Sequence, residues 1–563
     1  MNVIGRCLQF VLLLSLLVGL AAQSTDKQQS APAGQGSVSA ASAPDNDLCL
    51  SCHTDVGDKV KHNVHASVSC QSCHQKHEEY PHPDGIAKPS CATCHANMAT
   101  DYAHSVHGQA MKSGNLAAPD CATCHGKAHE IERTNTQAFR SAVPELCGSC
   151  HLDIVTEYQD SVHGQAVKNG FMQAPVCTDC HGEHLILGPK DAASSVNATH
   201  IRNTCAGCHN SVQLTRRFGL PSDRIVSFDA SYHGLASKAG GESAANCASC
   251  HGVHNIRASS DPKSTVHPNN LAKTCGKCHT GAGTRFAIGQ VHTMSGHSES
   301  AGVRWVRRFY LAVIPLTIGL MFAHNFGDWL RKLMRLRARS QYRAPDTADF
   351  ATAPLRTMKF ERIQHATLAI SFIVLAYTGF ALKYPDQGWA RPALLWESSH
   401  SMRGLIHRIA SIVFMTAAVA HVLSLIFSKK LRDHWMSLLP KWNDLREAIS
   451  NFAYNLGLTR RVPMRSSHSY IEKAEYWALV WGSMIMVVTG VLLWGTNLAL
   501  QWMPKWVLDV ATSIHFYEAV LASLAILVWH FYFVIFDPDV YPMDTAWLTG
   551  KSPRKEPSQD AQS

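Results

Sequence analysis

The sequence predicts a mostly helical chain of two unlike parts. The N-terminal part should contain short helices and loops, and the C-terminal part an all-α bundle of about five membrane-spanning helices. Three observations support this prediction. Nine copies of Cys-x-x-Cys-His lie within residues 47–300, nearly all long apolar runs lie after residue 303, and histidines recur inside those runs. The chain has 563 residues, enough for two or three domains.

The first 46 residues predict an export signal and a linker. Arg6 precedes an apolar run at 10–20, and Ala21 and Ala22 follow it. This run is short for a bilayer span, so we expect a signal peptide over 1–22, with a retained anchor as the alternative. Residues 23–46 are rich in Ser, Ala, Gln, Gly and Pro and predict a flexible linker.

The formal net charge of +9 is best explained by membrane topology. Lys and Arg gather in the loops of the C-terminal half, as the positive-inside rule requires of cytoplasmic segments. The sequence has no aromatic-interleaved basic stripe, so we expect no nucleic-acid partner.

All nineteen cysteines except Cys7 belong to the repeated motif. The nine motifs are Cys49/Cys52/His53, Cys70/Cys73/His74, Cys91/Cys94/His95, Cys121/Cys124/His125, Cys147/Cys150/His151, Cys177/Cys180/His181, Cys205/Cys208/His209, Cys247/Cys250/His251 and Cys275/Cys278/His279.

This spacing is the attachment signal for c-type haem. Two thiols add to the two vinyl groups of one haem, and the adjacent histidine binds the iron. Zinc ribbons or disulfides are the alternatives, and nine copies with no leftover cysteine argue against both. Each motif has only about 26 residues of chain, too few for an apolar core. We therefore expect a nonahaem cytochrome c domain over 47–300 whose haems form its core.

Enough histidines remain for every c-type iron to have a second one. Residues 1–300 hold 24 histidines, nine of them in motifs. Ser-x-His-Gly segments before motifs and Cys-His-Gly-x-His segments after them help to select nine candidates: His65, His77, His107, His129, His163, His184, His233, His254 and His292. Full ligation by histidine pairs leaves no open iron and so no obvious site for nitrite, tetrathionate or peroxide.

Five apolar segments are long enough for helical spans. They cover roughly 306–328, 362–383, 404–428, 475–498 and 511–536. The stretch 331–343 and the loop between the third and fourth spans are rich in Lys and Arg, so both should be cytoplasmic. We expect a first span with its basic segment over 301–345, a cytochrome b four-helix domain over 346–545, and a cytoplasmic tail over 546–563.

Histidines inside these spans predict two b-type haems, because polar groups in a membrane are costly and usually functional. His407 and His421 keep to nearly one face of the third span, and His515 and His530 to one face of the fifth. His407 and His515 should hold the outer haem. For the inner haem, the partner of His530 is either His365 or His421.

Glu518 is the one acid well inside the last four spans. It lies one turn after His515 and therefore faces the outer haem or its neighbourhood. Two interpretations are open. Glu518 could accept a proton from a quinol, or it could pair with Arg403 or Arg408 or make a helix hydrogen bond.

The segments 361–365 and 377–380, with the turn 404–407, resemble the diheme cytochrome b subunits of formate dehydrogenase and nickel-iron hydrogenase. In that family the ligands come from the first, second and fourth helices, which implies His365 here. The added His421 and the extra first span depart from the pattern. His421 resembles instead the four-histidine, two-helix scheme of bc-type complexes.

Nine c-type motifs followed by such a bundle are similar to the CbcL-type inner-membrane quinol dehydrogenases of metal-reducing bacteria. The resemblance implies menaquinol oxidation in the bacterial inner membrane and electron delivery to periplasmic c-type cytochromes. Alternatives are a quinone reductase with reversed flow, a terminal reductase with one open haem, and a haem scaffold without a quinone site. The sequence does not indicate an oligomeric state.

The motifs generate a direct test. After denaturing electrophoresis the chain should stain for covalent haem, and its pyridine haemochrome spectrum should contain c and b components near nine to two. A chain that holds zinc or disulfides at these cysteines would give no stain.

Overall fold

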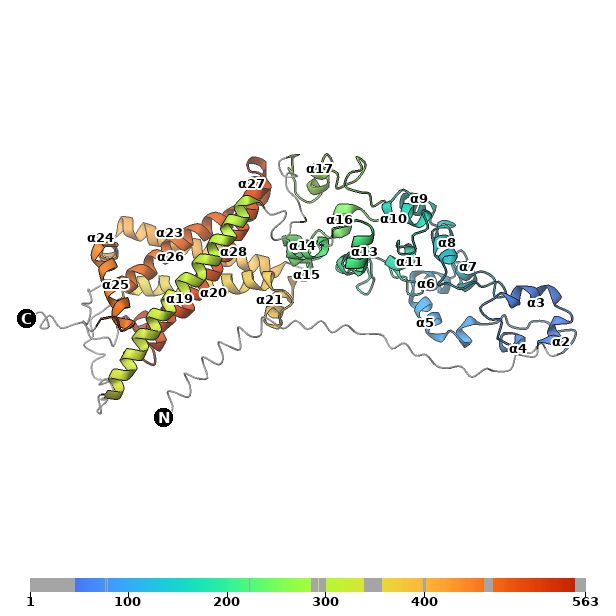
Figure 1. Ribbon diagram of the computed structural model, residues 1–563, viewed down its shortest axis with the longest axis horizontal. Helices are drawn as coiled ribbons and strands as arrows, with labels where there is room; N and C mark the ends of the chain where they lie inside the picture. Colours follow the sequence, from blue (N-terminus) through green and yellow to red (C-terminus); the bar gives the residue numbers. More distant parts are fainter. Residues whose placement is uncertain are drawn as a thin grey trace, which may run out of the picture. The chain divides into compact units, whose positions relative to one another are not determined.

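The computed structural model describes residues 46–284 except 76, 78 and 222, residue 292, and residues 300–338, 357–397, 401–459 and 469–551. The predicted signal peptide 1–22, the linker up to residue 45 and the tail beyond residue 551 lie outside them. Within the described residues the structure is helical without strands, as predicted (Figure 1). The chain forms two compact units: Met1–Ser90 with Lys127–Glu132, and Cys91–Gly126 with Arg133–Ser563.

The first unit is completed by a segment that is distant in the sequence. Its helices are α2 (Asp47–Leu50), α3 (Thr54–Lys61) and α4 (Cys70–Cys73). Residues 127–132 return to them: Asn63 Nδ2 donates to the Ala128 carbonyl at 2.7 Å and Val64 N to the Ile131 carbonyl at 3.3 Å. The unit division therefore falls inside the predicted 47–300 domain.

The second unit begins with short helices joined by loops. They are η1 (Cys91–Thr93), α5 (Ala96–His104), α6 (Val106–Lys112), α7 (Cys121–His125), α8 (Gln137–Gly148), α9 (Leu152–Gln159), α10 (Val162–Lys168), α11 (Cys177–His181), α12 (Ile201–His209), α13 (Val212–Arg217), α14 (Arg224–Ala230), α15 (Tyr232–Lys238), α16 (Cys247–His251) and α17 (Leu271–Gly276).

Each Ser-x-His-Gly segment starts one of these helices and fixes its first turn. In α10 the Gly164 N–H donates to the Ser161 hydroxyl at 3.0 Å, which caps the helix. Gly164 is required because a Cβ there would overlap the carbonyl oxygen of Tyr158. The same cap and close approach recur in α6 and α15. The histidine between the serine and the glycine is thereby held on a rigid turn.

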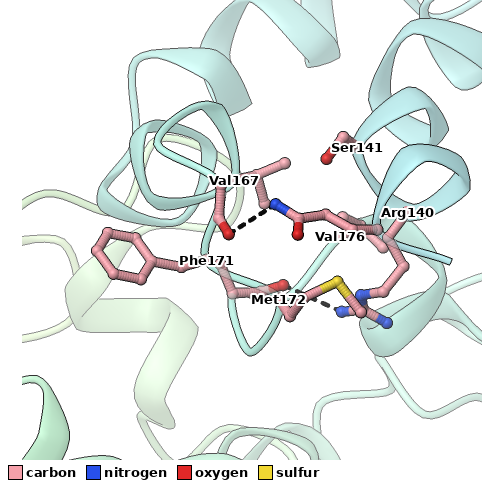
Figure 2. Close-up of a pocket in the computed structure, with 9 residues that line it drawn as sticks. Arg140, Ser141, Val167, Phe171, Met172 and Val176 are labelled. Atoms are coloured by element: carbon pink, nitrogen blue, oxygen red, sulfur yellow. Dashed lines mark hydrogen bonds between the residues drawn. The ribbon is translucent and has the colours of Figure 1, made fainter.

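Consecutive short helices are joined by polar contacts as well as apolar ones. Gln137 Nε2 on α8 donates to the Gly170 carbonyl at 2.8 Å, and Arg140 donates to the Ala174 carbonyl at 3.1 Å. Figure 2 shows these contacts around a small pocket whose lining includes Met172. The pocket lies among the motif-bearing helices and outside the membrane bundle.

Five helices are long and apolar enough to cross a membrane, which confirms the prediction. They are α19 (Ala301–Ala338), α20 (Lys359–Lys383), α23 (Met402–Phe427), α26 (Tyr470–Trp494) and α28 (Lys505–Ala525) with its continuation in η4 (Ile526–His530) and η5 (Tyr532–Phe536). Helix α20 packs on α23, α26 on α28, and α19 on α28 (Figure 1).

Two of these helices differ from the expected spans. Helix α19 continues ten residues past position 328 and is about 57 Å long. The C-terminal half of α19 is held by buried Lys332, whose Nζ lies 2.7 Å from a carboxylate oxygen of Asp328 and 2.7 Å from one of Asp537. Helix α28 becomes π-helical from Ile526 to Phe536, which its apolar sequence did not indicate.

Shorter helices connect the spans. They are η3 (Gly388–Ala390) and α21 (Arg391–Leu394) before α23, α24 (Lys429–Met436) and α25 (Trp442–Asn455) before α26, α27 (Thr496–Trp502) before α28, and α29 (Ala546–Thr549) near the end.

The cap geometry predicts that Gly164→Ala destabilises the protein. The added methyl forces α10 away from Tyr158, at a cost of about 1–3 kcal/mol. Thermal unfolding of the full-length protein in detergent measures this loss. The matched control is Gly207→Ala in α12, where a Cβ meets nothing within 4 Å. Equal melting temperatures for the two variants would contradict the prediction.

Candidate functional site

Eight of the nine motif histidines face another histidine within their own unit. The pairs and the distances between their ring centroids are His53–His82 6.3 Å, His74–His129 5.9 Å, His125–His184 6.0 Å, His107–His151 6.4 Å, His181–His254 6.2 Å, His163–His209 6.2 Å, His251–His292 6.3 Å and His233–His279 6.1 Å.

These separations fit one iron between two imidazoles. A metal–imidazole bond is about 2 Å long, so two rings bound to opposite sides of an iron have centroids about 6 Å apart. Burial lowers the pKa of His163 to about 4, so its ring is neutral at pH 7 and keeps the lone pair that a metal needs. The eighteen motif cysteines are free thiols. The donor set therefore fits covalently attached haem.

The motif cysteines differ in exposure. Nine are half-buried, and the other nine are exposed: Cys52, Cys73, Cys91, Cys94, Cys121, Cys124, Cys150, Cys208 and Cys278. Most of the exposed thiols belong to the second cysteine of a motif. The first cysteines of neighbouring motifs lie beside each other, as Cys147 and Cys177 do.

Four of the exposed cysteines lie outside the helices. Cys52, Cys94, Cys150 and Cys278 lie in turns just after α2, η1, α8 and α17 have ended, so no helix holds them against a neighbouring repeat. The hydroxyls of Ser51 and Ser149 lie 3.9 Å from the sulfurs of Cys52 and Cys150. Haem attachment at these four cysteines stays a prediction that depends on the motif.

The pairs follow a regular order along the chain. Each Ser-x-His-Gly histidine faces the second motif histidine that follows it, as His163 faces His209. Each histidine after Cys-His-Gly faces the motif histidine two motifs earlier, as His254 faces His181. The extended arm after His254 is also tied back, because Val162 N at the start of α10 donates to the Ile256 carbonyl at 2.8 Å. Neighbouring repeats thus exchange histidines.

Two of the nine candidates deviate from this pattern. His82, and not His77, faces His53 across a gap of 6.3 Å. The centroid of the His77 ring lies 5.1 Å from those of His74 and His82, closer than the separation of about 6 Å expected for two rings on one iron. His77 therefore gives way to His82 as the candidate. His65 lies at the repeat position of His107, after Asn63 and Val64 in place of Ser and Val.

In the membrane bundle, His407 on α23 and His515 on α28, the two residues predicted for the outer pair, are electrostatic neighbours. Each is oriented by a threonine on the helix packed against it. The Thr378 hydroxyl lies 2.8 Å from His407 Nδ1, and the Thr489 hydroxyl 2.9 Å from His515 Nδ1. A bonded Nδ1 leaves Nε2 for a metal. A Thr-Gly dipeptide in each helix was the sequence signal for these threonines, and it was missed.

At the other end of the bundle, His365 and His530 face each other with centroids 6.2 Å apart. Glu475 Oε1 lies 3.4 Å from His530 Nδ1. His421 points elsewhere: its Nε2 lies 3.1 Å from the Tyr476 hydroxyl. Of the two partners proposed for His530, the geometry favours His365.

The two hairpins α20–α23 and α26–α28 are related by an internal repeat. Thr378 matches Thr489, and His407 matches His515. Counting 13 residues back from each threonine gives His365 and Tyr476.

Counting forward from the outer histidines gives His421 after 14 residues and His530 after 15. The π-helical turn η4 accounts for the extra residue, because a π-helix holds more residues per turn. The pair His421–Tyr476 therefore occupies the repeat-related position of the pair His365–His530.

Glu518 is buried, and its partner comes from α19. The Tyr310 hydroxyl donates to Glu518 Oε2 at 2.7 Å. The predicted pairing with Arg403 or Arg408 is wrong, because Arg403 pairs with Glu397 at 3.2 Å and Arg408 lies over the Trp494 ring. The sequence placed no helix beside Glu518, so Tyr310 was not anticipated.

Comparisons with known proteins identify the membrane part. Residues 356–542 match the family described as prokaryotic cytochrome b561. The chain is 26% identical over 171 residues to the cytochrome b556 subunit of formate dehydrogenase from Haemophilus influenzae, covering 30% of this chain and 66% of that subunit. The match thus spans just under two thirds of that relative. No solved structure matches the chain. The C-terminal part is a b-type cytochrome membrane domain that serves electron transfer.

The threonine contacts predict that Thr489→Val shifts the midpoint potential of one b-type component. Loss of a hydrogen bond worth about 1 kcal/mol corresponds to ~40 mV for one electron. Redox titration of the b-type absorbance measures this shift. Thr416→Val is the control, because the Thr416 hydroxyl bonds only its own helix, at the Ile412 carbonyl. The prediction fails if both variants titrate like the wild type.

Proposed function

We propose that the protein is a CbcL-type menaquinol dehydrogenase of the bacterial inner membrane. It would oxidise menaquinol from the quinone pool and pass electrons through two b-type haems to nine c-type haems, then to periplasmic c-type cytochromes in anaerobic, metal-reducing respiration. The observation that carries this proposal is the recurrence of histidine pairs at iron-ligand spacing in both parts of one chain. Haem supplies one-electron transfer, with potentials tuned by its ligands and burial.

Ten pairs of histidines support two b-type and eight c-type sites. In the membrane domain we assign His407 with His515 and His365 with His530. In the remainder we assign the eight facing pairs, and we assign His95 as the motif ligand of a further site. His421 is left out of the haem ligands because the Tyr476 hydroxyl is its neighbour.

Contacts between motif cysteines support a continuous row of haem attachment points. The thiols of Cys147 and Cys177, from the fifth and sixth motifs, hydrogen-bond each other. The same contact joins the first cysteines of motifs one and two, three and four, and seven and eight. Cys180 and Cys208 bring motif six beside motif seven. Attachment points that meet in this order favour electron transfer along the chain.

Helix α15 and the ninth motif contact two loops at one end of the membrane domain. Lys238 on α15 lies 3.4 Å from Asp386 in the loop after α20, and the loop after α26 also contacts this region. Basic α24 and the end of α19 belong to the opposite side. The positive-inside rule favours a periplasmic c-type region and a cytoplasmic C-terminus.

The repeat-related pair His421–Tyr476 is our candidate for the quinol site. Quinol oxidation releases two protons, so the site needs hydrogen-bonding groups beside a haem. The His421 ring lies edge-on to Trp435 at 4.9 Å, and Trp435 stacks on Tyr476 at 4.8 Å. This aromatic cluster lies at the depth of His365 and His530. Glu518 with Tyr310 is the second candidate proton acceptor, at the outer haem.

Stopped-flow reduction by a menaquinol analogue tests the function. We expect the b-type absorbance bands to be reduced first and the c-type bands afterwards. His407→Ala and His515→Ala should each remove one b-type haem and leave covalent haem content unchanged. Reduction of the c-type bands while the b-type bands stay oxidised would refute the proposed order.

A second set of variants separates the two inner-site assignments. His365→Ala should remove a b-type haem, whereas Tyr476→Phe should retain both and slow quinol-driven b-type reduction about tenfold or more. Tyr377→Phe is the matched control, because its hydroxyl bonds the Trp389 carbonyl away from this cluster. If Glu518→Gln slows reduction and Tyr476→Phe does not, the quinol site lies at the outer haem.

A further inference from the structure

A side-chain hydrogen bond links helix α27 of the membrane domain to the last c-type motif. Asn497, the second residue of α27, lies with Oδ1 3.0 Å from His279 Nδ1. The His279 ring faces His233 at 6.1 Å, and an imidazole that binds iron through Nε2 carries a proton on Nδ1. The Nδ1–H group of His279 can therefore donate to the amide oxygen of Asn497.

The same stretch of chain also contacts the outer b-type site. The hydroxyl of Thr489 on α26, eight residues before Asn497, bonds Nδ1 of His515 on α28. Thr489 lies in the last two turns of α26, which ends at Trp494, and Asn497 lies in α27 just after Gly495. One short segment thus contacts a ligand of the outer b-type haem at one end and a ligand of the ninth c-type haem at the other.

Further contacts hold the ninth motif against α27. Gln501 Nε2 lies close to Gly281, 3.2 Å from the position that a Cβ there would take. Lys505, at the start of α28, is an electrostatic neighbour of His233. Lys238 on α15 reaches Asp386 beyond α20. The ninth site is therefore packed against both outer loops of the bundle.

We propose that Asn497 is a positioning residue for His279 and that electrons cross from the membrane domain to the c-type region at the ninth motif. By accepting from Nδ1–H, Asn497 holds the tautomer whose Nε2 binds iron and fixes the ring plane. The strength of this bond also sets the basicity of the ligand and hence the potential of that haem. This inference rests on the proposed function for its electron path, but the ligand contact does not require quinol chemistry.

The test compares Asn497→Leu, Asn497→Asp and the control Gln501→Leu in the full-length protein. Redox titration with chemical mediators should show one c-type component moved to higher potential by Leu and to lower potential by Asp, whose carboxylate is the stronger acceptor. Gln501→Leu should titrate like the wild type. Asp is isosteric with Asn, so N497D carries the test if N497L fails to assemble.

A kinetic measurement addresses the crossing point. With menaquinol analogue, Asn497→Asp should leave reduction of the b-type bands at the wild-type rate and slow their reoxidation by the c-type region about twofold or more, because a lower potential at the ninth haem reduces the driving force for b-to-c transfer. Unchanged c-type potentials in both variants would overturn the role of Asn497. Changed potentials with unchanged b-to-c transfer would overturn the crossing point. If the menaquinol analogue does not reduce the b-type bands of the wild-type protein, the proposed function itself is overturned.

Discussion

Two imidazole rings held about 6 Å apart, with room for one iron, are the constraint on which the rest of this structure depends. In the motif-bearing region few large apolar side chains are buried, and the described helices are only three to twelve residues long. Such helices are marginal on their own. Serine caps, glycine close approaches and exchanged arms all serve to bring a second ring opposite a motif histidine. In the membrane domain, threonines on adjacent helices orient the outer pair.

The hairpins α20–α23 and α26–α28 of the membrane domain share one design, but their inner residues differ in what they contact. Outer positions in both hairpins supply a histidine and a supporting threonine, so both copies contribute to the same pair. The inner positions differ. His365 on α20 faces His530 at the end of η4, whereas His421 on α23 contacts Tyr476 on α26. The π-helical turn before His530 shifts that ring by one residue relative to His421. A local change in helix geometry thus separates a haem-ligand position from a hydrogen-bonding one.

The sequence predicted the elements better than their partners. The five apolar segments were sufficient to predict the five long helices, and the nine motifs were sufficient to identify the motif histidines, because both signals are local. Which second histidine faces which motif is not a local property. His184 follows the sixth motif and faces the fourth, and no spacing rule near His184 indicates this. His82 was missed because the loop from His74 to His82 has no periodic pattern, and Tyr310 was missed because α19 lies outside the four-helix family.

Under the proposed function, in which the motifs carry covalent haem outside the cytoplasm, the exchange of histidines between repeats has a consequence for how the protein is made. His129 follows its partner His74 by 55 residues, and His254 follows His181 by 73. In a chain exported with its N-terminus first, an attached haem therefore waits with one axial position open until the next repeat has crossed the membrane. Maturation proceeds in steps of one repeat, and a chain cut short inside this region ends with an incompletely ligated iron upstream of the break.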